Sequence, residues 1–492
     1  MMTNMKKYSF SITAILLLVM CLAACKKKYG YSFEDGYNPN GVPDTLKKLV
    51  LDTSIYKIDR SQFNAARVFP GLVGIEEPRL KGIEVTLNLD YVVSNNDHLR
   101  VSVPPGGYFS TGMYAPAGEL IEIVVPSGVY GLTAQIGAWT DNLTGKDPLS
   151  RAPIIYSRQE LFPGKNMLRN LYGGHVWIIP PRPLGKKVTF QFTGVVKSPD
   201  FVLGETTNAE WKQMIANTKV PWFELRGKRI IFTLPVNKLA DFPIDDPQLL
   251  METWDKQVED GIWKWYGLSP DAVDVRDRNA MLPWRIVHDI QPSVGAQHSG
   301  YPVVATANDN YFKQAVTQSQ VIGFNWGTYH EIGHNMQMGS TWNFEGNGEV
   351  TCNLFSLKVA KMNGFKHSNY KRMLDAGLAF VNAAPPAAPA RKEFSATTTS
   401  LDARLGMYIQ ILERYGYGFM TYLVTEARHA RFGANNNQDK VDFFYEKLST
   451  YTQTDMEPFL TKWGIWVSTV SKTKISAQYP LLTEQVWLSN PI

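Results

Sequence analysis

The spacing of apolar residues changes along this chain, from every second position to every fourth. Ile83, Val85, Leu87 and Leu89 alternate with polar residues, which is the pattern of a strand with one buried face. Behind Asp246, the apolar positions recur every four residues, as in an amphipathic helix. A chain with this order of patterns is expected to be α+β, with a β-rich region first and a mainly helical region after it.

The β-rich pattern covers residues 61–235, which we interpret as a sandwich-like region. Further strand-like runs lie at 120–125, 132–136, 175–179, 188–192 and 229–234, separated by Pro and Gly turns. Helical periodicity follows around 326–338, 349–362, 401–413, 417–430 and 441–450. The Ala/Pro run NAAPPAAPA cannot be helical throughout. Residues 382–400 are therefore predicted to connect one helical unit, 236–381, to another, 401–492.

The N-terminus has the pattern of a bacterial export signal. Lys6 and Lys7 precede an apolar run that ends in Leu22-Ala23-Ala24-Cys25, small residues before a cysteine. We expect residues 1–24 to be removed, Cys25 to carry lipid, and residues 25–60 to form a tether. The body of the protein is then exported and anchored in the bacterial cell envelope. An ordinary secretory signal or a short membrane anchor is the alternative.

Charge and cysteine content limit the partners and the disulfides that the protein can have. The formal net charge is +5, and removal of Lys6 and Lys7 with the signal lowers it to +3. So small a surplus does not indicate nucleic acid as a partner. Cys21 leaves with the signal and Cys25 carries lipid, so Cys352 stands alone and no intrachain disulfide is expected.

Residues 330–334 read His-Glu-Ile-Gly-His, a pattern with metal-ligand spacing. Positions i and i+4 lie on one face of a helix, so the imidazoles of His330 and His334 can reach a single Zn²⁺. Glu331 lies beside that point, where it can take a proton from water and pass it to a leaving amine. A buried histidine pair without a metal is the alternative interpretation of so short a motif.

The residues around the motif support a helix. Asn325 is expected to cap it, Gly333 to leave room for close packing, and Gly339 to end it as a glycine beyond the last turn.

A catalytic zinc needs a third protein ligand, and two acids follow the motif closely. Glu345 lies in a glycine-rich loop, whereas Glu349 begins a second helical pattern, which would hold a ligand more firmly. We therefore favour Glu349. Asn353 lies one turn beyond it and could orient its carboxylate. Cys352 is interpreted as a buried structural thiol.

Several motifs in order along the chain resemble one family, the enhancin-like, mucin-targeting metallopeptidases. They are 330–337, 348–355, 112–119, 172–178, 298–302 and 463–465. The resemblance implies a zincin catalytic core, with zinc on His330, His334 and Glu349 and Glu331 as general base. It also implies cleavage of mucin-like O-glycoproteins, which relatives perform while recognising the glycan, and many relatives are lipoproteins.

The function expected from the sequence is a zinc-dependent endopeptidase that cleaves mucin-like O-glycosylated proteins at the cell envelope. A metallopeptidase acting on unglycosylated or cell-wall peptides is one alternative, and a non-catalytic glycan- or peptide-binding lipoprotein is another. The presence of Glu331 weighs against the second alternative, because zinc binding does not require it. The sequence identifies no substrate-binding residue and no oligomeric state.

Overall fold

The computed structural model describes residues 69–93, 95–387, 390–430 and 433–491. The predicted export signal, Cys25 and the tether lie outside these residues and stay predictions. Within the described ranges, no helix has both the length and the apolar character needed to cross a membrane. The order of elements is a β-sheet region followed by a helical region, as predicted.

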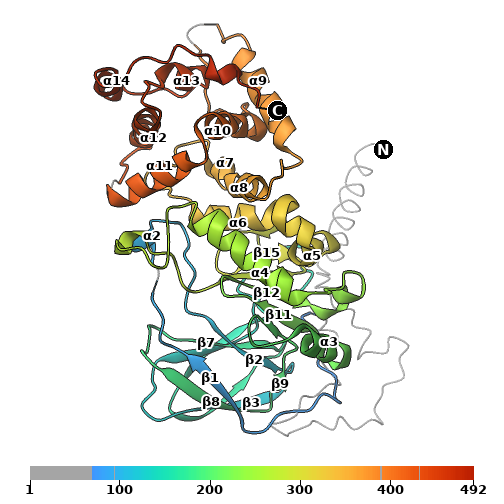
Figure 1. Ribbon diagram of the computed structural model, residues 1–492. Helices are drawn as coiled ribbons and strands as arrows, with labels where there is room; N and C mark the ends of the chain where they lie inside the picture. The colour runs from blue at the N-terminus through green and yellow to red at the C-terminus, as the bar shows by residue number, and fades with distance from the viewer. Residues whose placement is uncertain (1–68, 94, 388–389, 431–432, 492) are drawn as a thin grey trace, which may run out of the picture.

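Two antiparallel sheets form the N-terminal region (Figure 1). The four-stranded sheet has the order β1 (Ile83–Asn88), β8 (Lys187–Thr193), β3 (Leu120–Val125), β6 (Gly164–Arg169). The five-stranded sheet has the order β5 (Ser157–Leu161), β4 (Leu132–Ile136), β7 (Gly174–Ile179), β2 (Phe109–Ala115), β9 (Val196–Lys197). Ile121, Phe190 and Val176 are among the residues of both sheets that share one hydrophobic cluster.

The apolar side chains of the strand that begins at Ile83 are only partly buried. Leu87 and Leu89 belong to the shared cluster, but Ile83 is 38% exposed. The reason is that β1 is an edge strand, covered by a neighbour on one side only.

A third sheet of six strands supports the helical region. Its order is β10 (Phe201–Val202), β11 (Trp222–Arg226), β12 (Ile230–Pro235), β13 (Trp284–Asp289), β15 (Val303–Thr306), β14 (Gln297–His298). Strands β12 and β13 pair in parallel, so the predicted boundary at residue 235 falls between two neighbours of one sheet. The sequence did not predict β13, because all six of its residues are buried and its pattern has no period of two.

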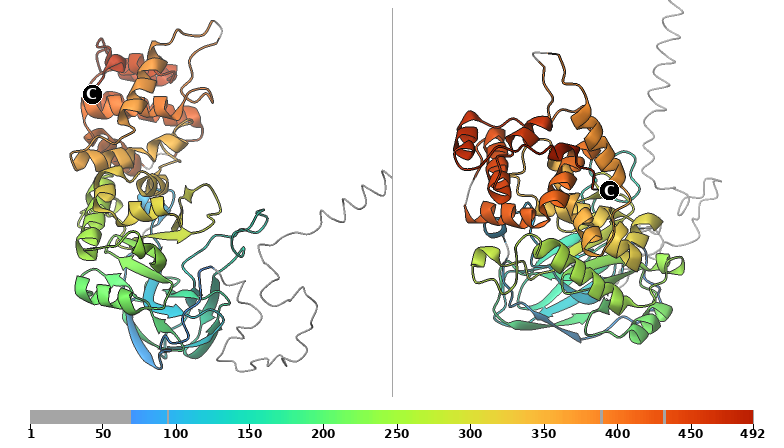
Figure 2. Two further views of the ribbon diagram at one scale, coloured as in Figure 1. Left: turned by 90° about the vertical axis from the view of Figure 1, so that its right-hand side faces the viewer. Right: turned by 45° about the horizontal axis from the view of Figure 1, so that its top comes forward.

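The helices lie beside this sheet and beyond it (Figure 1). They are α2 (Asn96–Leu99), α3 (Asn208–Asn217), α4 (Pro247–Val258), α5 (Asp309–Val316), α6 (Gly327–Met336), α7 (Gly348–Thr351), α8 (Leu354–Met362), α9 (Tyr370–Asn382), α10 (Leu401–Tyr415), α11 (Gly418–His429), α12 (Asn437–Thr452), α13 (Glu457–Lys462) and α14 (Thr469–Ser476). Figures 1 and 2 show the N-terminal sheets at one end of the molecule, α9 to α14 at the other, and α6 between them.

One large hydrophobic cluster joins the six-stranded sheet to the helices on both sides of α6. Ile286 of β13, Ile332 and Met336 of α6, and Leu354 of α8 all belong to it. Helix α6 is therefore held by burial against the sheet on one side and against α7 and α8 on the other. This packing fixes the position of any side chain that α6 presents at its surface.

The helix predicted at 349–362 is interrupted, so α7 and α8 are separate. The Nδ2 amide of Asn353 donates to the backbone oxygen of Glu349 at 2.7 Å. In a continuous α-helix, the backbone N–H of residue 353 would bind that oxygen. This N–H donates to Val350 O instead, at 3.0 Å. The side chain thus replaces a helical hydrogen bond, and the chain turns directly after α7.

Candidate metal centre

Helix α6 carries the His-Glu-x-x-His motif; the predicted residue caps its first turn, whereas its last turn ends earlier than predicted. Asn325 does act as a cap, because its Oδ1 accepts a hydrogen bond from the backbone N–H of Thr328 at 2.9 Å. The helix ends at Met336, since Gln337 is already extended. The prediction that Gly339 ends the helix is therefore wrong, and the reason is the side-chain bonding of Gln337 described below.

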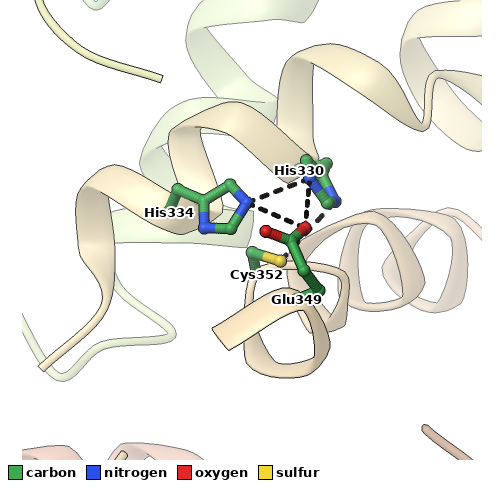
Figure 3. Close-up of side chains that lie close together, drawn as sticks. All are labelled: His330, His334, Glu349 and Cys352. Carbon is green, nitrogen blue, oxygen red and sulfur yellow. Dashed lines mark hydrogen bonds and ion pairs between the residues drawn. The ribbon is translucent and has the colours of Figure 1, made fainter. Parts of the chain in front are cut away.

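Three predicted ligand atoms converge on one point (Figure 3). The Nε2 atoms of His330 and His334 lie 3.1 Å apart. Oε2 of Glu349 lies 3.5 Å from the first and 3.3 Å from the second. Ligands placed tetrahedrally at ~2.0–2.1 Å from Zn²⁺ are roughly 3.3–3.4 Å from each other. The spacing of the three atoms therefore fits one zinc ion.

Hydrogen bonds on the far side of each imidazole fix its orientation. Nδ1 of His330 donates to Oδ1 of Asn353 at 2.6 Å, and Nδ1 of His334 donates to Oε1 of Gln337 at 3.0 Å. In the neutral form of each ring, Nε2 then carries a lone pair and faces the other Nε2 across 3.1 Å. Such an arrangement is repulsive unless a cation lies between the nitrogens, so the donor set fits a metal.

The side-chain amides of Asn353 and Gln337 also hold the segment that carries the third candidate ligand, Glu349. The amide nitrogen of Asn353 binds the backbone oxygen of Glu349, and that of Gln337 binds the backbone oxygen of Gly348 at 2.6 Å. Asn353 was predicted to orient the carboxylate of Glu349, but its bonds go to the Glu349 backbone and to His330. Gln337 was not predicted at all. Each carboxamide thus ties one histidine to α7.

Charge at the centre favours a cation. Burial lowers the pKa of His330, but contacts with Cys352 and Glu349 outweigh it and raise the pKa to about 10. The same balance raises the pKa of His334 to about 11. Hydrogen bonds from both histidines hold the pKa of Glu349 well below its usual range. The Glu349 side chain is 67% exposed, which leaves the centre open to solvent on that side, as a catalytic site requires.

Glu331 lies beside the ligands and is nearly buried. One of its carboxylate oxygens, Oε1, is 3.9 Å from Nε2 of His330. Burial raises the pKa of Glu331, and the two histidines oppose that rise. A carboxylate with a raised pKa next to a metal centre can accept a proton and release it again near neutral pH.

Two other predicted residues take the expected positions. Cys352 is fully buried, with Sγ 3.5 Å from Nδ1 of His330 and 3.6 Å from the backbone oxygen of Gly348. It lies among the possible ligands, since one ligand atom from each of His330, His334, Glu349 and Cys352 falls within 4.8 Å of the others. Glu345 lies in the exposed turn before α7 and is not part of this group.

Two side chains that the sequence did not assign to the site lie within electrostatic reach of Glu331. Nε2 of His298, on the edge strand β14, donates to Oδ2 of Asp141 at 2.8 Å. Burial lowers the pKa of His298, but the bond to Asp141 and, to a smaller extent, the charge of Glu331 raise it. Burial and then Glu331 raise the pKa of Tyr311 on α5. The ring of Tyr311 also lies against Gly327, one helical turn before Glu331. His298 begins one of the family-like segments, 298–302, whereas no sequence pattern links Tyr311 to the motif.

His175, which belongs to one of the motifs noted in the sequence, lies in the five-stranded sheet and is fully buried. Its Nε2 donates to the hydroxyl of Ser198 at 2.9 Å, and that hydroxyl donates to Asp200 at 2.5 Å. The hydroxyl thus fills the space between the imidazole and the carboxylate. We interpret this group as a buried polar network between the N-terminal sheets and the six-stranded sheet.

Two family profiles match the chain in succession. Residues 94–191 match the N-terminal domain of M60-like peptidases, and residues 194–464 match "Peptidase M60, enhancin and enhancin-like". The boundary between the matches lies before β10, so the second match contains the whole six-stranded sheet and the metal centre.

Curated relatives are about 30% identical to this chain over the aligned region. TRPM8 channel-associated factor 2 of Bos taurus is 30% identical over 78% of this chain and 40% of its own length. TRPM8 channel-associated factor 1 of Homo sapiens is 31% identical over 73% of this chain and 38% of its own length. The chain thus spans about 40% of the length of these relatives.

Solved structures share the fold. A functionally unknown conserved protein from Bacillus anthracis has a TM-score of 0.70, with 22% identity over 83% of this chain and 82% of its own. The catalytic module of the metalloprotease ZmpA from Clostridium perfringens has a TM-score of 0.65, with 16% identity over 83% and 81%. The M60 catalytic domain of ZmpC from that organism, in complex with the sialyl T antigen, has a TM-score of 0.65, with 17% identity over 82% and 81%.

Proposed function

Because the chain belongs to the peptidase M60, enhancin and enhancin-like family, we propose that it is a zinc-dependent endopeptidase acting on mucin-like O-glycosylated proteins. The observation that carries the proposal is the mutual spacing of the His330, His334 and Glu349 ligand atoms, 3.1–3.5 Å, with Glu331 beside them. A structural zinc site would not need a buried carboxylate in that position.

His330, His334 and Glu349 would hold the zinc, and the exposed side of Glu349 leaves room for water and substrate. A zinc ion bound there supplies Lewis-acid chemistry, which lowers the pKa of water to ~7 and polarises a carbonyl. Glu331 accepts the proton of the attacking water and returns it to the leaving nitrogen as the peptide bond breaks. Asn353 and Gln337 keep the two imidazoles in the tautomer that presents Nε2 to the metal.

The substrate class is supported by the relatives. The M60 catalytic domain of ZmpC was solved with the sialyl T antigen, an O-glycan, and shares the fold of this chain over most of its length. Export and lipid attachment at Cys25 would place the enzyme in the cell envelope, where it meets secreted glycoproteins.

The test is digestion of a defined O-glycopeptide by the purified protein. The wild type is expected to cleave the glycopeptide faster than the same peptide without sugar, and the Glu331→Gln variant to bind zinc but lose cleavage. Equal cleavage of both peptides would refute the substrate class. Full activity of the Glu331→Gln variant would refute the mechanism.

A non-catalytic binding protein is the second candidate. The names of the curated relatives, which describe association with a channel, favour it. The buried Glu331 beside the ligands weighs against it for this chain. Zinc binding without any peptide hydrolysis, across a panel of glycosylated and bare peptides, would support this second candidate.

A further inference from the structure

A cavity of about 870 Å³ lies beyond the C-terminal end of α6. Its walls come from α2 with the residues after it, from the 3-10 helix η5 (Val275–Asp277), from residues 337–340, and from the end of α11. Figure 1 shows α2 close to α11, and Nη1 of Arg100 donates to the backbone oxygen of Ala427 in α11 at 3.0 Å. The volume lies in the ~300–1,000 Å³ range of small-ligand sites.

The charged side chains around this cavity are basic. Arg100, Arg276, Arg428 and His98 line it, and no Asp or Glu in the described part of the chain does so. A cleft whose walls carry one sign of charge concentrates ions of the opposite sign. The cavity therefore favours an anion over a neutral or cationic ligand.

Two carboxylates lie behind the arginines, outside the cavity walls. Asp274 accepts hydrogen bonds from Nη2 and Nε of Arg276 at 2.5–3.1 Å. Asp277 accepts one from Nη2 of Arg428 at 2.9 Å. These pairs neutralise part of the positive charge, but they also fix both guanidinium planes. A guanidinium held in this way can bind an oxyanion with little further loss of side-chain freedom.

Arg276 keeps N–H groups for a ligand. Its bonds to Asp274 use the N–H of Nε and one N–H of Nη2, and a bond to the backbone oxygen of His429 at 3.4 Å uses one N–H of Nη1. A guanidinium has five N–H donors, so one on each terminal nitrogen has no partner among the described residues. The Arg276 side chain is 36% exposed and that of Arg428 is 1% exposed. Arg276 can thus contact a ligand directly, whereas Arg428 acts mainly through its charge.

The cavity adjoins the end of the helix that carries the two histidines. Gln337 lines it, and Oε1 of Gln337 accepts from Nδ1 of His334 at 3.0 Å. The segment that carries Arg100 is bonded to the same end of α6, because the backbone N–H of Val103 donates to the oxygen of Asn335 at 3.0 Å. Nδ1 lies on the opposite side of the imidazole from Nε2, the candidate metal ligand. A molecule in the cavity therefore does not compete with zinc.

We propose that this cavity binds an oxyanion, supplied by an acidic side chain of a polypeptide ligand. Arg276 would hold the carboxylate through its two remaining N–H groups, and Arg100 and Arg428 would add positive charge. Val101 and Val275 also line the cavity and would contact the methylene groups of a glutamate. A free phosphate ion offers similar oxygens, but it would leave most of the cavity to water. The inference goes beyond the proposed function and does not depend on peptide cleavage.

The test measures the binding of three probes by calorimetry, with zinc present and in the Glu331→Gln variant, so that no probe is cleaved. The probes are a short peptide with two adjacent glutamates, the same peptide with glutamines in their place, and inorganic phosphate. The glutamate peptide is expected to bind at least about 10-fold more tightly than the glutamine peptide, with a smaller difference at high salt. Phosphate is expected to compete with it only weakly.

Two further substitutions test the cavity itself. Arg276→Gln removes the proposed carboxylate partner, and Gly339→Glu adds a carboxylate to the cavity wall, where a Cβ meets nothing within 4 Å. Each is expected to weaken binding of the glutamate peptide about 10-fold and to leave the glutamine peptide unchanged. Arg372→Gln is the matched control, since Arg372 is also an exposed arginine paired with an aspartate, Asp402, but lies outside the cavity. It is expected to change no Kd.

Equal binding of the two peptides would overturn the proposal. Unchanged affinity for the glutamate peptide in both Arg276→Gln and Gly339→Glu would do the same, because the anion would then bind elsewhere. If phosphate binds and both substitutions abolish its binding while the two peptides bind equally, the cavity takes free ions and the polypeptide source is wrong. Gly339→Glu keeps the test decisive if Arg276→Gln fails to fold, which thermal unfolding of each variant would show.

Discussion

A Cβ atom on Gly333 would lie 2.2 Å from the backbone oxygen of Cys352. Real Cβ atoms do not approach an oxygen so closely, so α6 and the chain after α7 meet backbone to backbone at this point. Gly333 stands between the two histidine ligands in α6, and Cys352 follows the helix that carries Glu349. The missing side chain at residue 333 therefore sets the distance between the two ligand-bearing segments.

The Gly333→Ala variant is expected to lose zinc affinity by at least about 10-fold, because its methyl group would push Glu349 away from the histidines. Overpacking of this kind costs about 1–3 kcal/mol of stability. Zinc titration and thermal unfolding measure the two effects. Gly339→Ala is the control, since a Cβ there meets nothing within 4 Å. Wild-type zinc affinity in Gly333→Ala would show that the close approach does not position the ligands.

Gln337→Ala is expected to lower zinc affinity by roughly 10–100-fold, the usual effect of removing a partner of a metal-bound histidine. It frees the Nδ1 of His334 and breaks the bond to Gly348. Asn353→Ala is expected to lower zinc affinity by a similar factor, because it removes the hydrogen-bond partner of Nδ1 of His330. Competition with a chromogenic chelator measures both affinities. If both variants bind zinc as the wild type does, the two carboxamides do not hold the centre together.

The convergence of the three candidate ligands could be predicted from the sequence because helix geometry converts spacing into position. The i, i+4 period alone brings His330 and His334 to one face, and Glu349 was favoured over Glu345 because it begins a helical pattern. The ligand atoms of these three residues do lie together in the structure.

The partners of these ligands could not be predicted. Asn353 was expected to bind a carboxylate and binds His330 and the Glu349 backbone instead, which also ends α7. Which groups Asn353 binds depends on the angle between α6 and α7. The spacing of residues along the sequence does not determine that angle. The same holds for Tyr311 and His298, which reach Glu331 only because α5 and β14 pack against α6.

Tyr311→Phe is expected to lower kcat by roughly 100-fold with little change in KM. The hydroxyl lies within electrostatic reach of Glu331, and we expect it to donate a hydrogen bond to the carbonyl oxygen as negative charge develops there. Phenylalanine keeps the ring against Gly327 and removes only that donor. Steady-state kinetics on the glycopeptide measure the effect, with Tyr130→Phe, at a site 67% exposed, as control. An unchanged kcat would assign Tyr311 to packing alone.

The buried imidazole of His288 should make stability depend on pH. His288 lies on β13 with 1% exposure, and burial lowers its pKa from 6.5 to about 3. Between these values the unfolded chain binds a proton that the folded protein does not, so the free energy of unfolding rises with pH in this window. Stability is therefore lost as the pH falls below 6.5, by about 2 kcal/mol at pH 5.

His288→Leu removes the titrating group and keeps an apolar side chain at the position. Urea denaturation at pH 7.5 and pH 5, with zinc present, is expected to show a drop in the free energy of unfolding about 2 kcal/mol smaller for the variant than for the wild type. The informative quantity is this difference between two drops, because the substitution also changes packing against Phe312 at both pH values. Equal drops in the two proteins would mean that His288 becomes protonated in the folded state, and thus that water reaches its imidazole on β13.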